Sequence, residues 1–227
     1  DDTWSIGGVV REFISRCLVG GRTMMSENKK QNPPLGEGGR KLEINDFDAV
    51  SLYPSAMARM RGFLKGIPKV IYNNIDWKKQ DGYFVELEIT SINKHRKFPM
   101  MSIVDKKTGI RKWTDNLNDY EGQSVFVDRT TLEIWEKYHD IKYNFIRGYY
   151  FNEGFNTKIN DVIKYIFNKR KELKKQGNPA EQIYKLLMNS AYGKSITKAH
   201  DTKTVYKDED EYQDYLYRYY NWVKEAN

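Results

Sequence analysis

The chain has 227 residues, 39% of them hydrophobic and 14% aromatic, so it can bury a core and is not a disordered tail. Lysine and arginine outnumber aspartate and glutamate by 38 to 31. The resulting net charge of +7 modestly favours an anionic partner such as nucleic acid, although such a charge is also common among other proteins. The single cysteine, Cys17, excludes a disulfide framework and a cysteine-based zinc site, so we expect a reducing intracellular compartment. No run approaches the roughly 20 apolar residues of a membrane span, so we expect no membrane partner.

The N-terminal segment 3–21 is predicted to be a short amphipathic helix that stops at Gly20 and Gly21. Residues 28–41 are rich in proline and glycine and almost lack apolar side chains, which indicates a loop or linker. In the predicted N-terminal helix, the apolar residues recur at helical spacing; they are Val9, Val10, Phe13 and Ile14.

A strand, a tight turn and a helix are predicted in succession over residues 41–64. Residues 41–53 alternate between apolar and polar side chains, as a strand does. The helix follows at 54–64 with Pro54 in its first turn, where a missing N–H is tolerated. Asp48 therefore falls just before the turn, and Asp46, two residues earlier, could point the same way.

From about residue 70 to 150 the pattern is mostly of period two, which predicts strands. One helical stretch, 129–140, interrupts it, so we expect a separate mixed α/β subdomain. Two further helices are predicted at 159–177 and 180–193, separated by a Gly-Asn-Pro stop, and they should form an antiparallel hairpin. The tail 201–227 carries seven aromatic residues and seven acids against four basic residues, with no motif that indicates a role.

Basic residues on this helical hairpin have a regular spacing. Arg170 and Lys174 are four residues apart, so they share a helix face. Lys185, Asn189 and Tyr192 are spaced by four and three on the second helix. Facing stripes of this kind would make a cation cluster suited to a triphosphate, with Tyr192 able to stack on a base. The alternative, a charge run that only solvates an exposed helix, stays open on spacing alone.

Asp48 also allows two interpretations. A carboxylate at the end of a strand, beside a helix N-terminus, suits a divalent metal that carries phosphates, because free backbone amides of the turn receive the phosphate oxygens. An aspartate that caps the helix would have the same local sequence. The wider sequence context is needed to choose between them.

That context is a resemblance to a known family. Residues 48–54, DAVSLYP, resemble motif A of family B DNA polymerases, and residues 185–193, KLLMNSAYG, are similar to their motif B. The RKELK stretch at 170–174 is similar to the family's other triphosphate-binding stretch. The SLYP and NSAYG forms, the Gly-Gly pair before motif A and the inserted strands between the motifs look like the protein-primed branch of bacteriophages, linear plasmids and viruses. The resemblance covers residues 5–200.

The resemblance implies an α+β fold, a partial polymerase palm with an inserted mixed α/β subdomain and antiparallel two-helix fingers. The N-terminal part of the palm with motif A would occupy 1–68, and the inserted subdomain, which contacts the terminal protein in that branch, 69–150. The fingers with motif B would occupy 151–197, and 198–227 would start a second insertion or return to the palm.

The resemblance also implies roles for individual residues. Asp48 would be the catalytic carboxylate and ligate a pair of Mg²⁺ ions, assisted by the carbonyl of Ala49. Tyr53 would lie beneath the sugar and leave no room for a 2′-hydroxyl. The implied dNTP-binding residues are Ser51, Leu52, Tyr53, Arg170, Lys174, Lys185, Asn189 and Tyr192. The implied DNA-binding residues are Gly20, Gly21, Ser190, Gly193 and Lys194.

The implied function is template-directed DNA synthesis, in which a dNTP is transferred to a 3′-hydroxyl, with protein priming. The implied partners are the DNA template and primer, dNTP, a terminal protein and a C-terminal polymerase portion on a separate chain. A host cytoplasm, nucleus or mitochondrion is the expected compartment.

Three departures from the family pattern keep an alternative open. Leu18 stands where the family's Tyr-x-Gly-Gly motif has tyrosine, and no editing exonuclease is expected before residue 1. Motif C, an Asp-Thr-Asp that supplies the second metal-binding carboxylate, is absent, since the similar stretch 199–206 has Lys203 at the second acid. A non-catalytic remnant or split module that binds nucleic acid or a replication partner is therefore the competing hypothesis. A basic structural domain would require the three ordered motifs to be coincidental.

Overall fold

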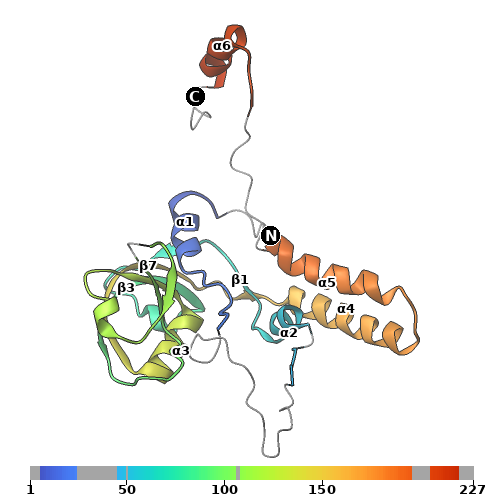
Figure 1. The fold of residues 1–227 in the computed structure, drawn as a ribbon, viewed down its shortest axis with the longest axis horizontal. Coiled ribbons are helices and arrows are strands. Elements are labelled where there is room, and N and C mark those ends of the chain that lie inside the picture. The colour runs from blue at the N-terminus through green and yellow to red at the C-terminus, as the bar shows by residue number, and fades with distance from the viewer. Residues whose placement is uncertain (1–5, 25–44, 50, 106–107, 196–204, 220–227) are drawn as a thin grey trace, which may run out of the picture.

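The structure is a computed structural model that describes residues 6–24, 45–49, 51–105, 108–195 and 205–219. A sheet with one covering helix forms the body of the fold, and a two-helix hairpin extends from it (Figure 1). The combination of an antiparallel sheet and separate helices confirms the predicted α+β class. Over the same ranges, no helix has the length and apolar character needed to cross a bilayer.

The main sheet has four antiparallel strands in the order β2-β7-β3-β6. Two long strands, β3 (Gly82–Ile92) and β7 (Ile141–Phe151), pair along their length with two register shifts. They are flanked by β2 (Lys69–Val70) and β6 (Val125–Asp128). A separate pair, β4 (Ser102–Val104) and β5 (Arg111–Trp113), forms a hairpin beside this sheet. The period-two pattern therefore predicted the strands of this region correctly.

Helix α3 (Arg129–His139) covers one face of the sheet, as the pattern at 129–140 predicted. Its first turn is capped by Asp128, whose Oδ1 accepts the amide of Thr131 at 2.9 Å. Leu132 and Trp135 of this helix are buried together with apolar residues of the strands, so the core lies between α3 and the sheet. The strand residues in this core include Val85, Leu87, Ile89, Val125 and Val127.

Helix α1 (Gly8–Arg16) packs against the sheet through Phe13. The ring of Phe13 meets the rings of Phe126 and Tyr149 edge to face, each with centroids 5.1 Å apart. The helix ends at Arg16 and not at the glycines, which corrects the expected stop at Gly20 and Gly21. Leu18, just beyond it, is 69% exposed, so extending the helix over this residue would not bury its side chain.

The predicted strand over residues 41–53 is wrong for the part that the structure describes. Residues 45–49 form no strand and are exposed, and Phe47 is 91% exposed. Residues 41–44 and 50 lie outside the described residues. A strand needs a neighbour for its N–H and C=O groups, and no described strand pairs with 45–49. Alternating hydrophobicity alone therefore did not predict the structure of this segment correctly.

Helix α2 (Leu52–Arg59) follows the turn and has Pro54 in its first turn, as predicted. It ends five residues before the predicted end at 64, because Met60 is extended and Gly62 has a φ of +126°. Residues Phe63–Leu64 instead form strand β1, which pairs with β8 (Phe155–Asn156). This two-stranded ribbon connects α2 to the sheet and the sheet back to the hairpin.

The hairpin consists of α4 (Lys158–Lys175) and α5 (Glu181–Ser195), which lie side by side (Figure 1). Ile163 and Met188 are fully buried, and α2 contacts both helices. The predicted antiparallel helical hairpin is confirmed within about two residues at each end. A further helix, α6 (Glu209–Tyr219), lies in the acidic, aromatic tail.

The division into domains at 1–68, 69–150, 151–197 and 198–227 stays a prediction. Helix α1 of the first segment packs on the sheet of the second. The first segment therefore has contacts with two parts of the molecule, the sheet through α1 and the hairpin through α2.

Candidate active site

The turn before α2 has an unusual backbone at Ser51. This residue has φ 50° and ψ 53°, the left-handed region, which costs a non-glycine residue roughly 1–2 kcal/mol. Ser51 is the N-cap of α2, and its carbonyl accepts the amide of Ser55 at 2.8 Å. N-cap residues usually have an extended backbone and bond a first-turn amide through the side chain, and Ser51 does neither.

As a result, the first turn of α2 keeps free donors. Within the described part of the chain, the backbone amides of Leu52 and Tyr53 have no acceptor, and Pro54 has no N–H. Unpaired amides at the positive end of a helix dipole attract anions, and phosphate oxygens above all. The turn thus offers two backbone donors that could receive the oxygens of a triphosphate, and the role of Leu52 and Tyr53 toward dNTP stays a prediction.

Arg170 of α4 joins this turn to the hairpin. Its Nη1 donates to the hydroxyl oxygen of Ser51 at 3.1 Å, and its Nε donates to Oε2 of Glu181 in α5 at 3.0 Å. The side chains of Arg170 and Glu181 are only 16% and 14% exposed. A hydrogen bond to a charged group contributes roughly 1.5–3 kcal/mol, more than an exposed ion pair does. This contribution is comparable to the cost of the left-handed backbone at Ser51.

Tyr53 and Tyr192 bring the motif A and motif B segments together. Their rings are stacked, with centroids 4.1 Å apart and planes inclined by 15°. Burial raises the pKa of Tyr192, and the Tyr53 phenol, with which it shares a hydrogen bond, raises it further. Tyr53 remains 53% exposed, so the stack is open to solvent on one side.

The predicted phosphate-binding lysines are open. Lys174 and Lys185 are exposed, and neither forms an ion pair with any residue that the structure describes. Lys169, by contrast, is paired with Glu172 at 3.2 Å. Asn189, one turn after Lys185, is exposed as well. The two lysines are therefore available to an anion, whereas Arg170 is already committed to Glu181.

Asp48 and Ala49 are exposed and lie just before the turn. Asp46 is exposed too, so neither acid is held in a preformed cage. Within the ranges described, no group of three or more acidic, histidine or cysteine side chains is arranged to hold a metal ion. Their assignment as metal ligands stays a prediction.

The predicted DNA-binding residues are dispersed. Gly20 and Gly21 lie in a segment without helix or strand, and Ser190 and Gly193 are exposed on α5. A Cβ atom added at Gly20, Gly21 or Gly193 would meet no other atom within 4 Å. Packing against the described residues therefore does not require glycine at these positions, and a role toward DNA stays a prediction. The side chain of Lys194 lies outside the described set.

Sequence reasoning missed Asn160, which fixes the other end of α2. Its Nδ2 donates to the carbonyls of Met57 at 3.0 Å and Met60 at 2.6 Å. Asn160 is buried in the first turn of α4, so it ties the C-terminus of α2 to the base of the hairpin. Asparagine favours turns and helix caps, so its presence indicates a hydrogen bond to a nearby backbone group. It does not indicate hydrogen bonds to residues about 100 positions earlier in the chain.

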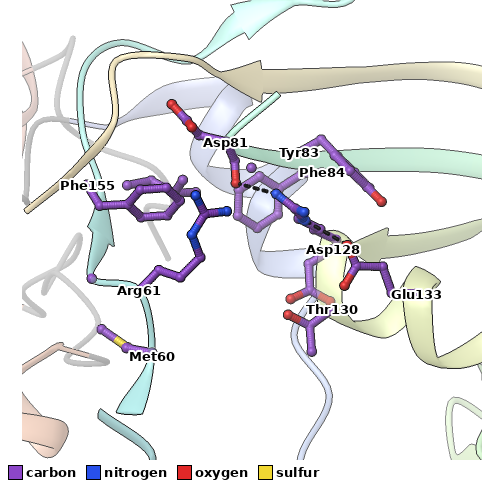
Figure 2. Close-up of a pocket in the computed structure, with 13 residues that line it drawn as sticks. Met60, Arg61, Asp81, Tyr83, Phe84, Asp128, Thr130, Glu133 and Phe155 are labelled. Atoms are coloured by element: carbon purple, nitrogen blue, oxygen red, sulfur yellow. Dashed lines mark hydrogen bonds and ion pairs between the residues drawn. The ribbon is translucent and has the colours of Figure 1, made fainter. Parts of the chain in front are cut away.

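Two hollows adjoin these elements, and predicted site residues line neither. One, of about 470 Å³, lies between α2 and α4. The other, of about 370 Å³, lies where the β1–β8 ribbon meets the main sheet (Figure 2). In it the guanidinium of Arg61 lies over the ring of Phe155, 4.5 Å from the centroid. The site built by Ser51, Tyr53 and Tyr192 is therefore distinct from both hollows.

Comparisons with known proteins relate the chain to a protein family and to solved structures. Residues 8–226 match the model of a family described as DNA polymerase type B, organellar and viral. The chain is 30% identical over 172 residues to a DNA polymerase of Acidianus bottle-shaped virus (isolate Italy/Pozzuoli), an alignment that covers 70% of this chain and 24% of the relative.

Similar solved structures include Phi29 DNA polymerase with primer-template DNA, at a TM-score of 0.46 and 22% identity over 65% of this chain and 25% of that one. The Phi29 ternary complex with incoming nucleotide substrates has a TM-score of 0.46 and 24% identity, with the same coverage of both chains. The chain thus spans about a quarter of the length of the viral relative and of the Phi29 chains. On the family match over nearly its whole length, the chain belongs to the organellar and viral type B DNA polymerases.

Proposed function

We propose that this chain supplies the nucleotide-binding turn and hairpin of a DNA polymerase, which transfers a dNTP to a 3′-hydroxyl under the direction of a template. The observation that carries the proposal is the stack of Tyr53 on Tyr192. These residues belong to segments that are far apart in the sequence, and the stack sets the free amides of the turn beside the hairpin. Family membership and the name of the viral relative support the same reaction.

The triphosphate would lie between the turn and the hairpin. The amides of Leu52 and Tyr53 would donate to its oxygens, and Lys174 and Lys185 would offset its charge. Fixed donors and cations of this kind stabilise the charge that develops on the departing pyrophosphate, which is the main contribution a protein makes to phosphoryl and nucleotidyl transfer. Both lysines are exposed, and neither forms an ion pair with a described residue, which supports this assignment.

The sugar and base would displace one tyrosine ring from the other. Rings whose centroids are 4.1 Å apart leave no space for a third group between them. We therefore infer that nucleotide binding separates the stack, after which Tyr53 lies beneath the sugar and Tyr192 beside the nascent base pair, with Asn189 one turn earlier on α5. In that position the ring of Tyr53 would exclude a 2′-hydroxyl.

The metal requirement is met only in part by the described residues. Nucleotidyl transfer of this type uses two divalent ions about 4 Å apart, held by several carboxylates. Asp48 and the carbonyl of Ala49 fit one wall of a Mg²⁺ site, but no described cluster completes it. We expect the remaining acids to come from outside this chain, on the C-terminal polymerase portion.

Primer-template DNA and, in a protein-primed enzyme, a terminal protein would be the macromolecular partners. The inserted subdomain 69–150 would meet the terminal protein, and Gly20, Gly21, Ser190, Gly193 and Lys194 would approach DNA. The alternative function, a module that binds nucleic acid or a replication partner without catalysis, rests on the lack of a motif C in this sequence.

A primer-extension assay with Mg²⁺ separates these functions. We expect no extension by the 227-residue chain alone, and extension once a C-terminal polymerase piece that carries the second acidic motif is added. Asp48→Asn should abolish the restored synthesis and so excludes a contaminating polymerase. Nucleotide binding without extension in either arrangement would favour the non-catalytic module. Asp48-dependent extension by the chain alone would contradict the need for a second acidic motif.

A further inference from the structure

We propose that Arg170 is a positioning residue that holds the motif A turn open for nucleotide, and not a direct ligand of the triphosphate. This inference rests on the proposed function, because it assigns Arg170 a task within the same site. It departs from the role that the resemblance to the triphosphate-binding stretch implied for this residue.

The first argument is the environment of the guanidinium. Glu181 and the Ser51 hydroxyl each accept a hydrogen bond from Arg170, and its side chain is 16% exposed. The carboxylate of Glu181 holds the guanidinium at 3.0 Å, so a phosphate would have to compete with it for Arg170. Lys174, one turn later on the same helix, is exposed and has no ion pair among the described residues.

The second argument is the state of the helix cap. A serine at an N-cap normally adopts an extended backbone and bonds a first-turn amide with its hydroxyl. Ser51 is left-handed instead, and its hydroxyl accepts from Arg170. Because Pro54 has no N–H, Tyr53 would be the amide that a conventional Ser51 cap engages. Arg170 thereby keeps the donor of Tyr53 free for an anion.

Without Arg170, we expect Ser51 to relax to an extended backbone and to cap the Tyr53 amide. The site would then lose one of its two backbone donors, although no group that touches the phosphates was removed. Glu181→Gln should have the same effect in weaker form, because Glu181 holds the guanidinium at Ser51.

The first experiment reads the turn directly, without nucleotide. Backbone chemical shifts of Ser51 and amide exchange of Tyr53 are measured by NMR in the complete 227-residue chain. In Arg170→Ala, Ser51 should change from left-handed to extended shifts, and exchange of the Tyr53 amide should slow by about 5-fold, the factor for a cap of about 1 kcal/mol. Lys174→Ala, the matched control on the same helix, should leave both unchanged.

The second experiment measures the affinity of the same variants for Mg²⁺-dGTP by equilibrium dialysis. Arg170→Ala should weaken binding by about 10-fold, the factor for one lost hydrogen bond to a charged group. Adding Ser51→Gly should restore most of this affinity, because glycine adopts the left-handed backbone without strain and has no hydroxyl to form a cap. Lys174→Ala should also weaken binding, but Ser51→Gly should not rescue it.

The outcomes separate the two roles. If Ser51→Gly fails to rescue Arg170→Ala, and Glu181→Gln binds nucleotide as tightly as the unmodified chain or more tightly, Arg170 is a phosphate ligand and the proposal is overturned. If the unmodified chain binds no nucleotide, the proposed function fails, yet the NMR experiment still decides the positioning role. An unchanged Ser51 backbone in Arg170→Ala overturns that role whatever the affinity.

Discussion

Tyr53 in the first turn of α2 and Tyr192 near the end of α5 stack with their ring centroids 4.1 Å apart. The turn and the hairpin thus meet through two aromatic rings, while Arg170 bonds the same turn through Ser51. Both contacts join residues that sequence resemblance assigns to one nucleotide site.

Tyr53 should select deoxyribose. In the complete polymerase, Tyr53→Val should lower the ratio of kcat/KM for dNTP over rNTP by at least about 10-fold, since a smaller side chain no longer excludes the 2′-hydroxyl. Tyr53→Phe keeps the ring and should retain most of the ratio. Steady-state kinetics with matched nucleotide pairs measures this effect, and an equal ratio in Tyr53→Val and the unmodified enzyme would remove Tyr53 from sugar selection.

Lys185 should contribute far more to kcat/KM of the complete polymerase than Lys171 does. Lys185→Ala should lower kcat/KM of the complete polymerase by about 100-fold, the scale for one lost electrostatic donor to a transition state. Lys171 is exposed on the same hairpin, on a different face from Arg170 and Lys174, and Lys171→Ala should change kcat/KM little. Equal losses in the two variants would favour the hypothesis that the basic run only solvates the hairpin.

Asn160 should stabilise the junction of α2 and α4. Asn160→Ala leaves the carbonyls of Met57 and Met60 without their donor and should lower the free energy of unfolding by about 1–3 kcal/mol. Asn168→Ala, at an exposed position of the same helix, is the matched control and should change it by less than about 0.5 kcal/mol. Urea unfolding followed by circular dichroism measures both, and equal stabilities would show that the Asn160 bonds contribute nothing.

Cys17 should make stability depend on alkaline pH. Burial, assisted by the Asp128 carboxylate, raises the pKa of this thiol to about 12 in the folded chain. The unfolded thiol releases its proton from about pH 9 upward, so its deprotonation favours unfolding between that pH and about 12. Relative to Cys17→Ala, the chain should lose up to about 1.4 kcal/mol per pH unit in this window.

Urea unfolding at pH 8, 9, 10 and 11 measures this difference, because other titrating groups cancel between the two proteins. Below about pH 9 the difference in stability should be constant. A constant difference up to pH 11 would mean that the thiol is not buried from solvent.

Sequence patterns predicted the helices and most strands correctly, because the spacing of apolar residues and the positions of proline lie within each element. The spacing of apolar residues located α3, α4 and α5, and Pro54 marked the first turn of α2. The strand expected at 41–53 did not appear in residues 45–49, since strand formation depends on a neighbour that the local pattern does not report. The resemblance assigned Tyr53 and Tyr192 to one site, which spacing alone could not do, and the structure stacks their rings.

The contacts that hold the site together were not predictable in the same way. The bonds from Arg170 to Ser51 and from Asn160 to Met57 join residues about 100 positions apart. The left-handed backbone of Ser51 is a tertiary effect, because serine does not favour that region on its own. Glu181 carried a weak signal, an acid in the first turn of a helix, but that signal indicates a dipole interaction and not its pairing with Arg170.

The central claim is that the turn at 51–55 and the hairpin face at 185–193 form one nucleotide site. Amide hydrogen exchange of the 227-residue chain, with and without Mg²⁺-dGTP, tests it most directly. We predict that nucleotide slows exchange in both segments at the same concentration, and that Lys185→Ala shifts both responses together to higher concentration while Lys171→Ala does not. Protection of one segment without the other, or of neither, would contradict a shared site.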